Sequence, residues 1–281
     1  MMQAVLWALA LIAASCLVRA IYNAYLHPLR GYPGQEPLIR GYVDKLEATL
    51  RSRFGEPLDI GLCFACTAFD VLGALAFGKD FGGLETGRAP LYRIVVDDEL
   101  SKARKAEFNF ATERARERLE RGIMMEKHDF MSYMLKYNDE KGMSEGEIMS
   151  NSSVLIIAGG ETSAVYLSGT IYHVLCKPRV MEKLASIIRS TFKSEDEITF
   201  NALSEIEYLS AVILEGGRTY APVPSGLPRV ATKGGSLILD RHVPEGTVVY
   251  VHAMAVNLSP ANLADPDDFV PERWLKPPPA K

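Results

Sequence analysis

The sequence predicts a mainly α-helical body with a small β-sheet, an α+β fold, joined to an N-terminal membrane anchor helix. Two apolar segments, residues 58–77 and 148–176, have the length of helices rather than strands. The β-rich runs 237–239 and 247–251 come later in the chain, with a Pro-Glu-Gly turn between them. Helices are therefore expected first, and a small sheet is expected to follow them.

The composition favours a folded protein in a reducing, cytosol-facing location. The chain has 281 residues, of which 48% are hydrophobic, and this is enough for the core of one large domain or two small ones. Its formal net charge of -4 provides no basic field for a phosphate backbone, which argues against nucleic acid as a partner. The four cysteines do not show the pattern of a disulfide framework.

Residues 1–22 are interpreted as a membrane anchor. Residues 4–18 are almost wholly apolar, which is short of the about 20 residues that a bilayer span needs, but Arg19 can extend from the helix end to the lipid headgroups. Basic residues follow the apolar stretch and none precedes it, which favours an uncleaved anchor over a cleaved signal peptide. The prolines and glycines of residues 23–35 predict a non-helical hinge, and residues 36–281 form the body.

The body is predicted to begin with a surface helix and a buried helix. Apolar residues recur at helical spacing from Leu38 to Leu50, with charged residues on the opposite side. Segment 58–77 resembles a membrane span, but Asp70 near its centre would cost about 3 kcal/mol in a bilayer. A buried core helix with Asp59 as its N-cap is therefore favoured. Its C-x-x-C pair lacks a second ligand pair at zinc-site spacing, so both cysteines are expected in the core.

The next helices are predicted from charge and hydrophobic patterns. Residues 97–127 carry alternating charges of both signs and predict a solvated helix. Segment 148–176 predicts an unusually long helix that stops before Pro178. The pair Gly159 and Gly160 in its centre is expected to weaken the hydrogen-bond ladder there.

One more helix is predicted before the β-rich runs. Ser204 and Glu207 have the spacing of a capping box, so a helix is expected to open there and to run toward Arg218. Three prolines, at positions 222, 224 and 228, are expected to end it. No internal repeat is visible along the chain.

Three short motifs carry the candidate chemistry. They are Ala-Gly-Gly-Glu-Thr-Ser at 158–163, Glu-Gly-Gly-Arg at 215–218 and Phe-Val-Pro-Glu-Arg-Trp at 269–274. Each alone fits an ordinary structural role, because Glu and Arg three residues apart are common helix partners and Pro-Glu-Arg is a common loop sequence. Their order is far more specific, with Leu-Pro-Arg at 227–229 between the last two.

Together the motifs resemble the cytochrome P450 family, the haem-thiolate monooxygenases, and look most like its microsomal fungal members of secondary metabolism. The resemblance reaches, with gaps, from residue 22 to residue 275. It implies a cytochrome P450 fold with haem iron as cofactor, and insertion of one oxygen atom from O2 into an apolar small-molecule substrate. It also implies electrons from NADPH through a membrane-bound NADPH-cytochrome reductase, and an endoplasmic reticulum location with the body facing the cytosol.

The resemblance assigns roles to individual residues. Glu161 and Thr162 match the oxygen-activating positions, where a carboxylate can relay protons and a hydroxyl can donate a hydrogen bond. Gly159 and Gly160 match a local helix break that makes room for dioxygen over the iron. Arg229 matches a strand arginine that pairs with a haem propionate.

A further set of residues matches a structural network of the family. Glu215 and Arg218 match its buried ion pair, with Arg273 as the third member. Buried charges persist only when they are paired, so these three are interpreted as structural rather than catalytic. Because haem and its surrounding segments normally complete the core, the three charges are expected to lack some of their partners. Gly216 and Gly217 add a cost of about 2 kcal/mol relative to alanines within a helix.

The sequence departs from the family at the metal ligand. The family places the proximal cysteine thiolate in a glycine-rich loop after Pro-Glu-Arg, whereas the last cysteine here is Cys176, so no metal ligand is assigned. The segment that normally follows residue 34 is also shortened. The chain is therefore expected to be a truncated cytochrome P450 body, doubtful in haem binding and inactive by itself.

Several alternatives stay open at this point. The first is an active monooxygenase whose sequence is incompletely recorded, and the second is a non-catalytic membrane interaction protein. Haem held through His242, His252 or Met254 is disfavoured, because lone histidines in strands and turns are more often surface or core residues than ligands. A metal-free hydrolase is weaker still, because no Ser, His and acid are marked out by motif context.

Overall fold

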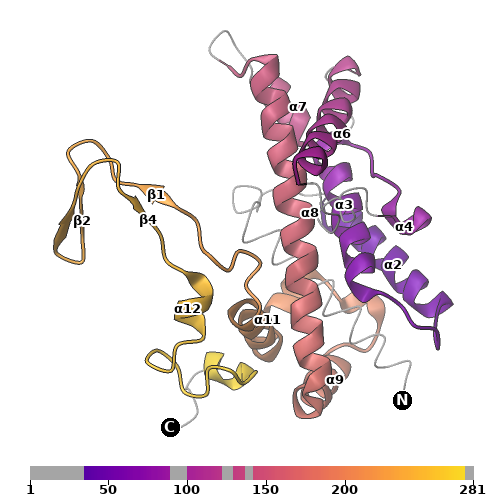
Figure 1. Ribbon diagram of the computed structural model, residues 1–281. Coiled ribbons are helices and arrows are strands. Elements are labelled where there is room, and N and C mark those ends of the chain that lie inside the picture. Colours follow the sequence, from indigo (N-terminus) through magenta and orange to yellow (C-terminus); the bar gives the residue numbers. More distant parts are fainter. Residues whose placement is uncertain (1–34, 89–99, 122–128, 137–141, 276–281) are drawn as a thin grey trace.

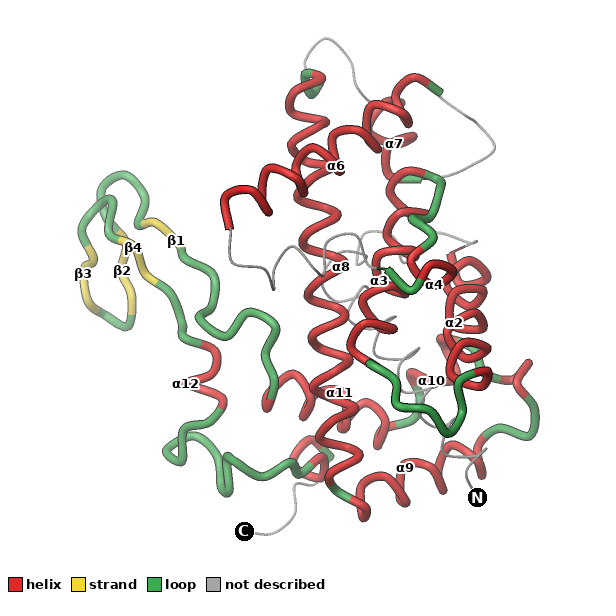
Figure 2. Tube along the Cα trace, turned by 45° about the vertical axis from the view of Figure 1, so that its right-hand side comes forward, coloured by secondary structure: helices red, strands yellow, loops and turns green. Residues whose placement is uncertain are grey.

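The computed structural model of the protein describes residues 35–88, 100–121, 129–136 and 142–275. The predicted anchor and all but the last residue of the predicted hinge lie outside these ranges. Within them the chain is mainly helical, as the sequence predicts, and it has two small antiparallel sheets (Figures 1 and 2).

The elements follow one another in the predicted order, helices first. The α-helices are α2 (Gln35–Ser52), α3 (Ile60–Phe77), α4 (Gly83–Thr86), α6 (Leu100–Glu120), α7 (Phe130–Lys136), α8 (Glu145–Cys176), α9 (Pro178–Thr191), α10 (Phe200–Ser204), α11 (Glu207–Thr219) and α12 (Ala253–Asn257). The other elements are the 3-10 helices η3 (Glu195–Glu197) and η4 (Pro271–Trp274) and the strands β1 (Arg229–Val230), β2 (Ser236–Ile238), β3 (Arg241–Val243) and β4 (Val248–Val249).

Helix α8 is the central element of the body, and α3, α6, α9 and α11 all pack against it (Figure 1). It opens with a capping box, in which the Ser144 hydroxyl accepts from the Glu147 N–H and the Glu147 carboxylate accepts from the Ser144 N–H. This box is present in the sequence but was not predicted. The helix ends at Cys176, and Pro178 occupies the first turn of α9, as expected for a proline.

Helix α3 is a buried core helix, as predicted. The Asp59 side chain caps it by accepting from the Leu62 N–H at 3.0 Å. Among the described residues, α3 and α8 have the length and apolar composition of a membrane span. Most of α3 is nevertheless covered by other parts of the protein, as expected of a core helix.

Asp70 of α3 is buried, and backbone hydrogen bonds stabilise its carboxylate in this apolar helix. Its carboxylate accepts hydrogen bonds from three backbone N–H groups: that of Phe81 at 3.1 Å, that of Gly83 at 2.8 Å and that of Leu84 at 2.8 Å. Burial raises the pKa of this carboxyl group, while the three hydrogen bonds act in the opposite direction. Asp70 thereby fixes the loop that leads into α4 against the core.

The prediction of a solvated helix before α8 is wrong for one face of α6. Ala111 and Ala115 are fully buried there, and so is the charged Arg118. The Arg118 guanidinium donates to both carboxylate oxygens of Asp129, at 2.6 and 3.1 Å, and to the Ser132 hydroxyl at 2.7 Å. Charge alternation therefore concealed a buried ion pair, which joins α6 to the start of α7.

The start of α11 also differs from the prediction. Its N-cap is Ile206, without a side-chain hydrogen bond, and Ser204 instead ends the short helix α10, where its hydroxyl donates to the Asn201 carbonyl. The predicted capping box at Ser204 is therefore wrong, and the helix begins three residues later, at Glu207, although it does run to Arg218 as expected. Thr199, which precedes α10, provides the side-chain cap in this region.

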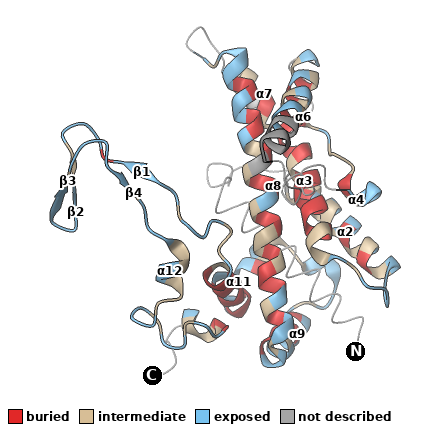
Figure 3. Cartoon of the chain, in the orientation of Figure 1, coloured by how far each residue is buried: buried red, intermediate tan, exposed pale blue. Residues whose placement is uncertain are grey.

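The predicted small sheet is two separate ribbons. Strand β1 pairs antiparallel with β4, and β2 pairs antiparallel with β3. The expected Pro-Glu-Gly turn is present, with Thr247 N–H donating to the Pro244 carbonyl at 3.2 Å. Residues 227–252, here called the β arm, extend away from the helical body, and Figure 3 shows that most of their residues are exposed.

Candidate functional site

The motif at 158–163 lies in the middle of α8. The Thr162 hydroxyl donates to the Ala158 carbonyl one turn earlier, at 2.5 Å, and Thr162 is partly buried. Glu161 is exposed to solvent. The hydroxyl is therefore held by the helix itself, whereas the neighbouring carboxylate can exchange protons with water.

The glycine pair of this motif makes room for another helix. A Cβ on Gly160 would overlap the ring of Phe69, and a Cβ on Gly159 would lie 2.9 Å from Leu72 Cδ2. Both of these side chains belong to α3, which packs closely across α8 at this point. Helix α8 continues without interruption through both glycines, so the expected break is not present. The glycines instead allow the two helices to approach closely.

Replacing Gly160 by alanine is expected to destabilise the protein by about 1–3 kcal/mol, the usual cost of overpacking. Alanine is the better helix former by about 1 kcal/mol, so any loss of stability must come from the contact with Phe69. The measurement is urea unfolding followed by circular dichroism. Gly41→Ala in α2 is the matched control, because no atom lies within 4 Å of its added Cβ, and it should be slightly stabilising. Equal effects at both positions would contradict this role for Gly160.

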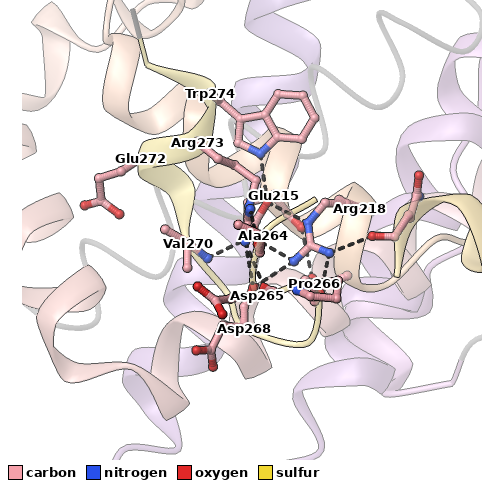
Figure 4. Close-up of polar contacts among 12 residues, drawn as sticks. Glu215, Arg218, Ala264, Asp265, Pro266, Asp268, Val270, Glu272, Arg273 and Trp274 are labelled. Carbon is pink, nitrogen blue, oxygen red and sulfur yellow. Dashed lines mark hydrogen bonds and ion pairs between the residues drawn. The ribbon is translucent and has the colours of Figure 1, made fainter. Parts of the chain in front are cut away.

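Glu215 is the centre of a buried polar network between α11 and the segment that ends in η4 (Figure 4). The Arg218 guanidinium donates to both carboxylate oxygens at 2.9 Å, and Arg273 Nε donates to Oε1 at 3.1 Å. The Val270 N–H and the Trp274 indole N–H complete the set at 2.7 and 2.8 Å. Burial alone would raise the pKa of Glu215, but these hydrogen bonds outweigh it and lower the pKa.

The two arginines of this network have further partners. Arg218 and Arg273 also donate to backbone carbonyls at the end of α12 and in the chain between α12 and η4. The acceptors are Asn257, Pro266 and Asp268 for Arg218, and Ala264, Asp265 and Asp268 for Arg273. Glu215, Arg218 and Arg273 therefore come together as predicted, and the expectation that they lack partners is wrong. Val270 and Trp274 were not predicted, because their part is visible only in three dimensions.

A second cluster, here called the Glu272 cluster, lies beside the first. Arg179 of α9 donates to both Glu272 oxygens at 2.6 and 3.0 Å, and Lys183 Nζ donates to Oε1 at 3.1 Å. The Tyr208 hydroxyl of α11 donates to the same oxygen at 3.2 Å, and Lys183 Nζ lies 4.0 Å from the centre of the Tyr208 ring. The hydrogen bonds from Arg179 lower the pKa of Glu272 to about 2. Sequence reasoning missed this cluster, because α9 is about ninety residues from Glu272.

The lowered pKa of Glu272 predicts a loss of stability in acid. A group whose pKa is lower in the folded state stabilises the fold above its unfolded pKa, about 4.3, and that contribution disappears as the pH falls toward the folded value. The chain with Glu272 should therefore exceed Glu272→Gln in stability at neutral pH, and this difference should close as the pH falls to about 2. Urea unfolding of both proteins across this range measures the difference. A difference that stays constant with pH would contradict the prediction.

The remaining predicted site residue, Arg229, lies on β1 in the β arm. It is exposed, and its Nη1 donates to the Pro228 carbonyl at 2.9 Å. The structure therefore does not bring Arg229 together with the motif on α8, since Figure 1 shows β1 on the arm that extends from the body.

The described residues do not complete a haem site. Three cysteines lie among them: Cys63 and Cys66 are buried in α3, and Cys176 is exposed at the end of α8. Burial raises the pKa of the Cys66 thiol to about 11, which keeps it protonated at neutral pH. Arg229 is exposed on β1, where its guanidinium donates to the carbonyl of the preceding residue, Pro228. The described residues therefore do not bring together a thiolate ligand for the iron and an arginine partner for a haem propionate.

Known proteins resemble this chain in both sequence and fold. The family profile described as Cytochrome P450 matches residues 96–279. Cytochrome P450 monooxygenase aclL of Aspergillus oryzae and trichothecene C-4 hydroxylase of Trichoderma arundinaceum are both 37% identical to the chain, over 88% of it and 56% of each relative. The chain thus spans about half the length of the curated relatives that it matches. The solved structure of the cytochrome P450DA heme domain has a similar fold, with a TM-score of 0.72 and 18% sequence identity. The match covers 93% of this chain and 61% of that one. Because the family profile covers more than half of the chain, the chain belongs to the cytochrome P450 family.

Proposed function

We propose that this chain is part of a haem-dependent monooxygenase that inserts one oxygen atom from O2 into an apolar small molecule, as in fungal secondary metabolism. NADPH would supply electrons through a cytochrome reductase, and residues 1–22 would hold the protein at the endoplasmic reticulum membrane. The observation that carries the proposal is the complete Glu215 network next to a central helix with the 158–163 motif. Family membership and the printed names of the fungal relatives support it.

The α8 residues have separable tasks in this proposal. Thr162 would present a hydroxyl whose proton is held by the Ala158 carbonyl until another acceptor replaces it. Glu161 would pass protons from solvent, because it is exposed and adjacent. Glu215, Arg218 and Arg273 would act as structure, because their polar atoms are engaged with one another and with backbone groups.

We further propose that these 281 residues alone do not form thiolate-ligated haem and are inactive by themselves. The reason is the position of the sulfur atoms: all four cysteines precede both halves of the Glu215 network, and the two α3 cysteines are buried in the core. The test is to express the full chain in membranes, supply haem, reduce it and add carbon monoxide. We expect no thiolate-type Soret band. A thiolate-type band would show that this part of the proposal is wrong, and its loss in Cys176→Ser would identify Cys176 as the ligand.

The framework part of the proposal has its own test. Residues 1–275 can be joined to the segment that follows the matching position in the trichothecene C-4 hydroxylase, which is a full-length relative. We expect this chimaera to acquire a thiolate-type band when the added segment carries its cysteine and to lose it when that cysteine is replaced by alanine. A chimaera that folds cooperatively but never binds haem through sulfur would contradict the framework proposal.

A second candidate function is a non-catalytic interaction protein that pairs with a full-length member of the family. The observation in its favour is the exposed apolar surface of the β arm, where Leu227, Leu237 and Leu239 are 62%, 71% and 92% exposed. Co-purification with a defined full-length relative in membranes tests it. Leu237→Asp should abolish the pairing, and no co-purification of the unchanged chain would remove this candidate.

A further inference from the structure

The 3-10 helix η4 connects two separate polar networks. It is a single turn, Pro271–Trp274, and backbone hydrogen bonds join it to the residues on either side: the Arg273 N–H donates to the Val270 carbonyl at 3.2 Å, and the Leu275 N–H donates to the Glu272 carbonyl at 3.1 Å. Consecutive side chains on this turn point in different directions. Figure 4 shows Glu272 directed away from Glu215, while Trp274 is directed toward it.

Because so short a turn has little stiffness of its own, side-chain contacts must determine its orientation. The contacts on one side are those of Arg273 and Trp274 with the buried Glu215. The contacts on the other side are those of the Glu272 cluster, which attach the turn to α9 and α11. The Glu272 side chain is 20% exposed, and it accepts a bidentate arginine. Such a pair is stronger and more directional than an ordinary surface ion pair.

We propose that Glu272 is a positioning residue: its contacts with Arg179, Lys183 and Tyr208 orient η4 so that Arg273 and Trp274 reach Glu215. Without the Glu272 carboxylate, the turn would rotate on its remaining contacts, and the Trp274 indole N–H and the Val270 N–H would move away from Glu215. This inference goes beyond the proposed function and does not depend on it, because it concerns contacts present without haem.

The experiment follows the two groups that the proposal says will move. In a Trp7→Phe background, Trp274 is the remaining tryptophan, so its emission reports on the indole. Hydrogen exchange reports on the Val270 amide. Under native conditions, Glu272→Gln is expected to shift the Trp274 emission to longer wavelength, to increase its quenching by acrylamide and to speed the exchange of the Val270 amide.

The matched control is Asp268→Asn in the same segment. It removes an exposed ion pair with Lys177 at 3.1 Å, but keeps the Asp268 carbonyl that Arg218 uses. Trp274 emission and Val270 exchange should not change in this variant. Native-state signals that also stay unchanged in Glu272→Gln, with only a lower unfolding midpoint, would show that Glu272 merely adds stability and would overturn the proposal.

A second variant keeps the test decisive if Glu272→Gln does not fold. Arg179→Gln changes an exposed side chain of α9 and removes the bidentate contact while Glu272 remains. It should shift the Trp274 emission in the same direction and by less. The exchanged pair, Arg179→Glu with Glu272→Arg, should recover part of the shift. The absence of any shift in Arg179→Gln and of any recovery in the exchanged pair would also overturn the proposal.

Discussion

Glu215→Gln is expected to cost about 3–5 kcal/mol of the free energy of unfolding, because it leaves the buried Arg218 without a counter-charge. Glutamine is nearly isosteric with glutamate, so packing is unchanged and the loss is electrostatic. Its amide also presents two donors to a site where donors already converge, including the Val270 N–H and the Trp274 indole. Since a domain is stable by about 5–15 kcal/mol in total, a large part of the stability would disappear. Urea unfolding followed by circular dichroism measures this loss.

The control for this prediction is an exposed carboxylate with a single cationic neighbour. Glu85→Gln removes a 3.4 Å pair with Lys45, in which the side chains are 72% and 46% exposed. Such pairs contribute about 0–1 kcal/mol, so this variant should unfold almost as the unchanged chain does. A Glu215→Gln protein no less stable than Glu85→Gln would show that the buried network contributes little.

Asp129→Asn is expected to have the second largest effect, again about 3–5 kcal/mol, because Arg118 would remain charged in a site where both side chains are almost fully buried. Asparagine keeps an oxygen that can accept from the Ser132 N–H, as Asp129 does at 2.7 Å, so the expected loss comes from the uncompensated charge of Arg118. The measurement is the same unfolding experiment. Glu56→Gln, which removes an exposed pair with Arg53, is the control and should change stability little.

A double substitution tests whether the ion pair itself stabilises the fold, or whether the loss in Asp129→Asn comes only from the unpaired buried charge. Replacing Arg118 by methionine and Asp129 by leucine removes both charges and leaves apolar groups of similar volume. Because desolvation consumes most of the gain of a buried pair, the double variant should be more stable than either single variant. If it is the least stable of the three, then the ion pair is itself a major source of stability.

Hydrophobic patterns predicted three of the main helices, but not α9 (Pro178–Thr191), for which no helix was expected. The buried α3, the amphipathic α2 and the long α8 all lie where the apolar pattern places them, because each pattern is local to its own helix. Capping was less well predicted: Ser204 has the right spacing but ends a helix, whereas Ser144 forms the real capping box. Side-chain spacing alone does not determine whether a serine begins or ends a helix, and the backbone at Ser204 already belongs to α10.

The candidate site was predicted in part. Glu215, Arg218 and Arg273 were recognised from motifs and meet in the structure. Their partners Val270 and Trp274, and the whole Glu272 cluster, were not recognised, because an ion pair between α9 and η4 leaves no periodic signal in the sequence. Pairs of this kind follow from the fold rather than from local propensity.

By itself the sequence determined the order and type of the main elements and the family motifs, because both depend on residues close together in the chain. Tertiary structure decided what the glycine pairs do. Gly216 and Gly217 look like a cost of about 2 kcal/mol in an isolated helix, yet they face Thr170 and Tyr166 of α8, and a Cβ on Gly217 would lie 2.7 Å from the Tyr166 ring. Because the two glycines have no side chains, α8 and α11 can approach each other closely. This need for glycine becomes visible once both helices are in place.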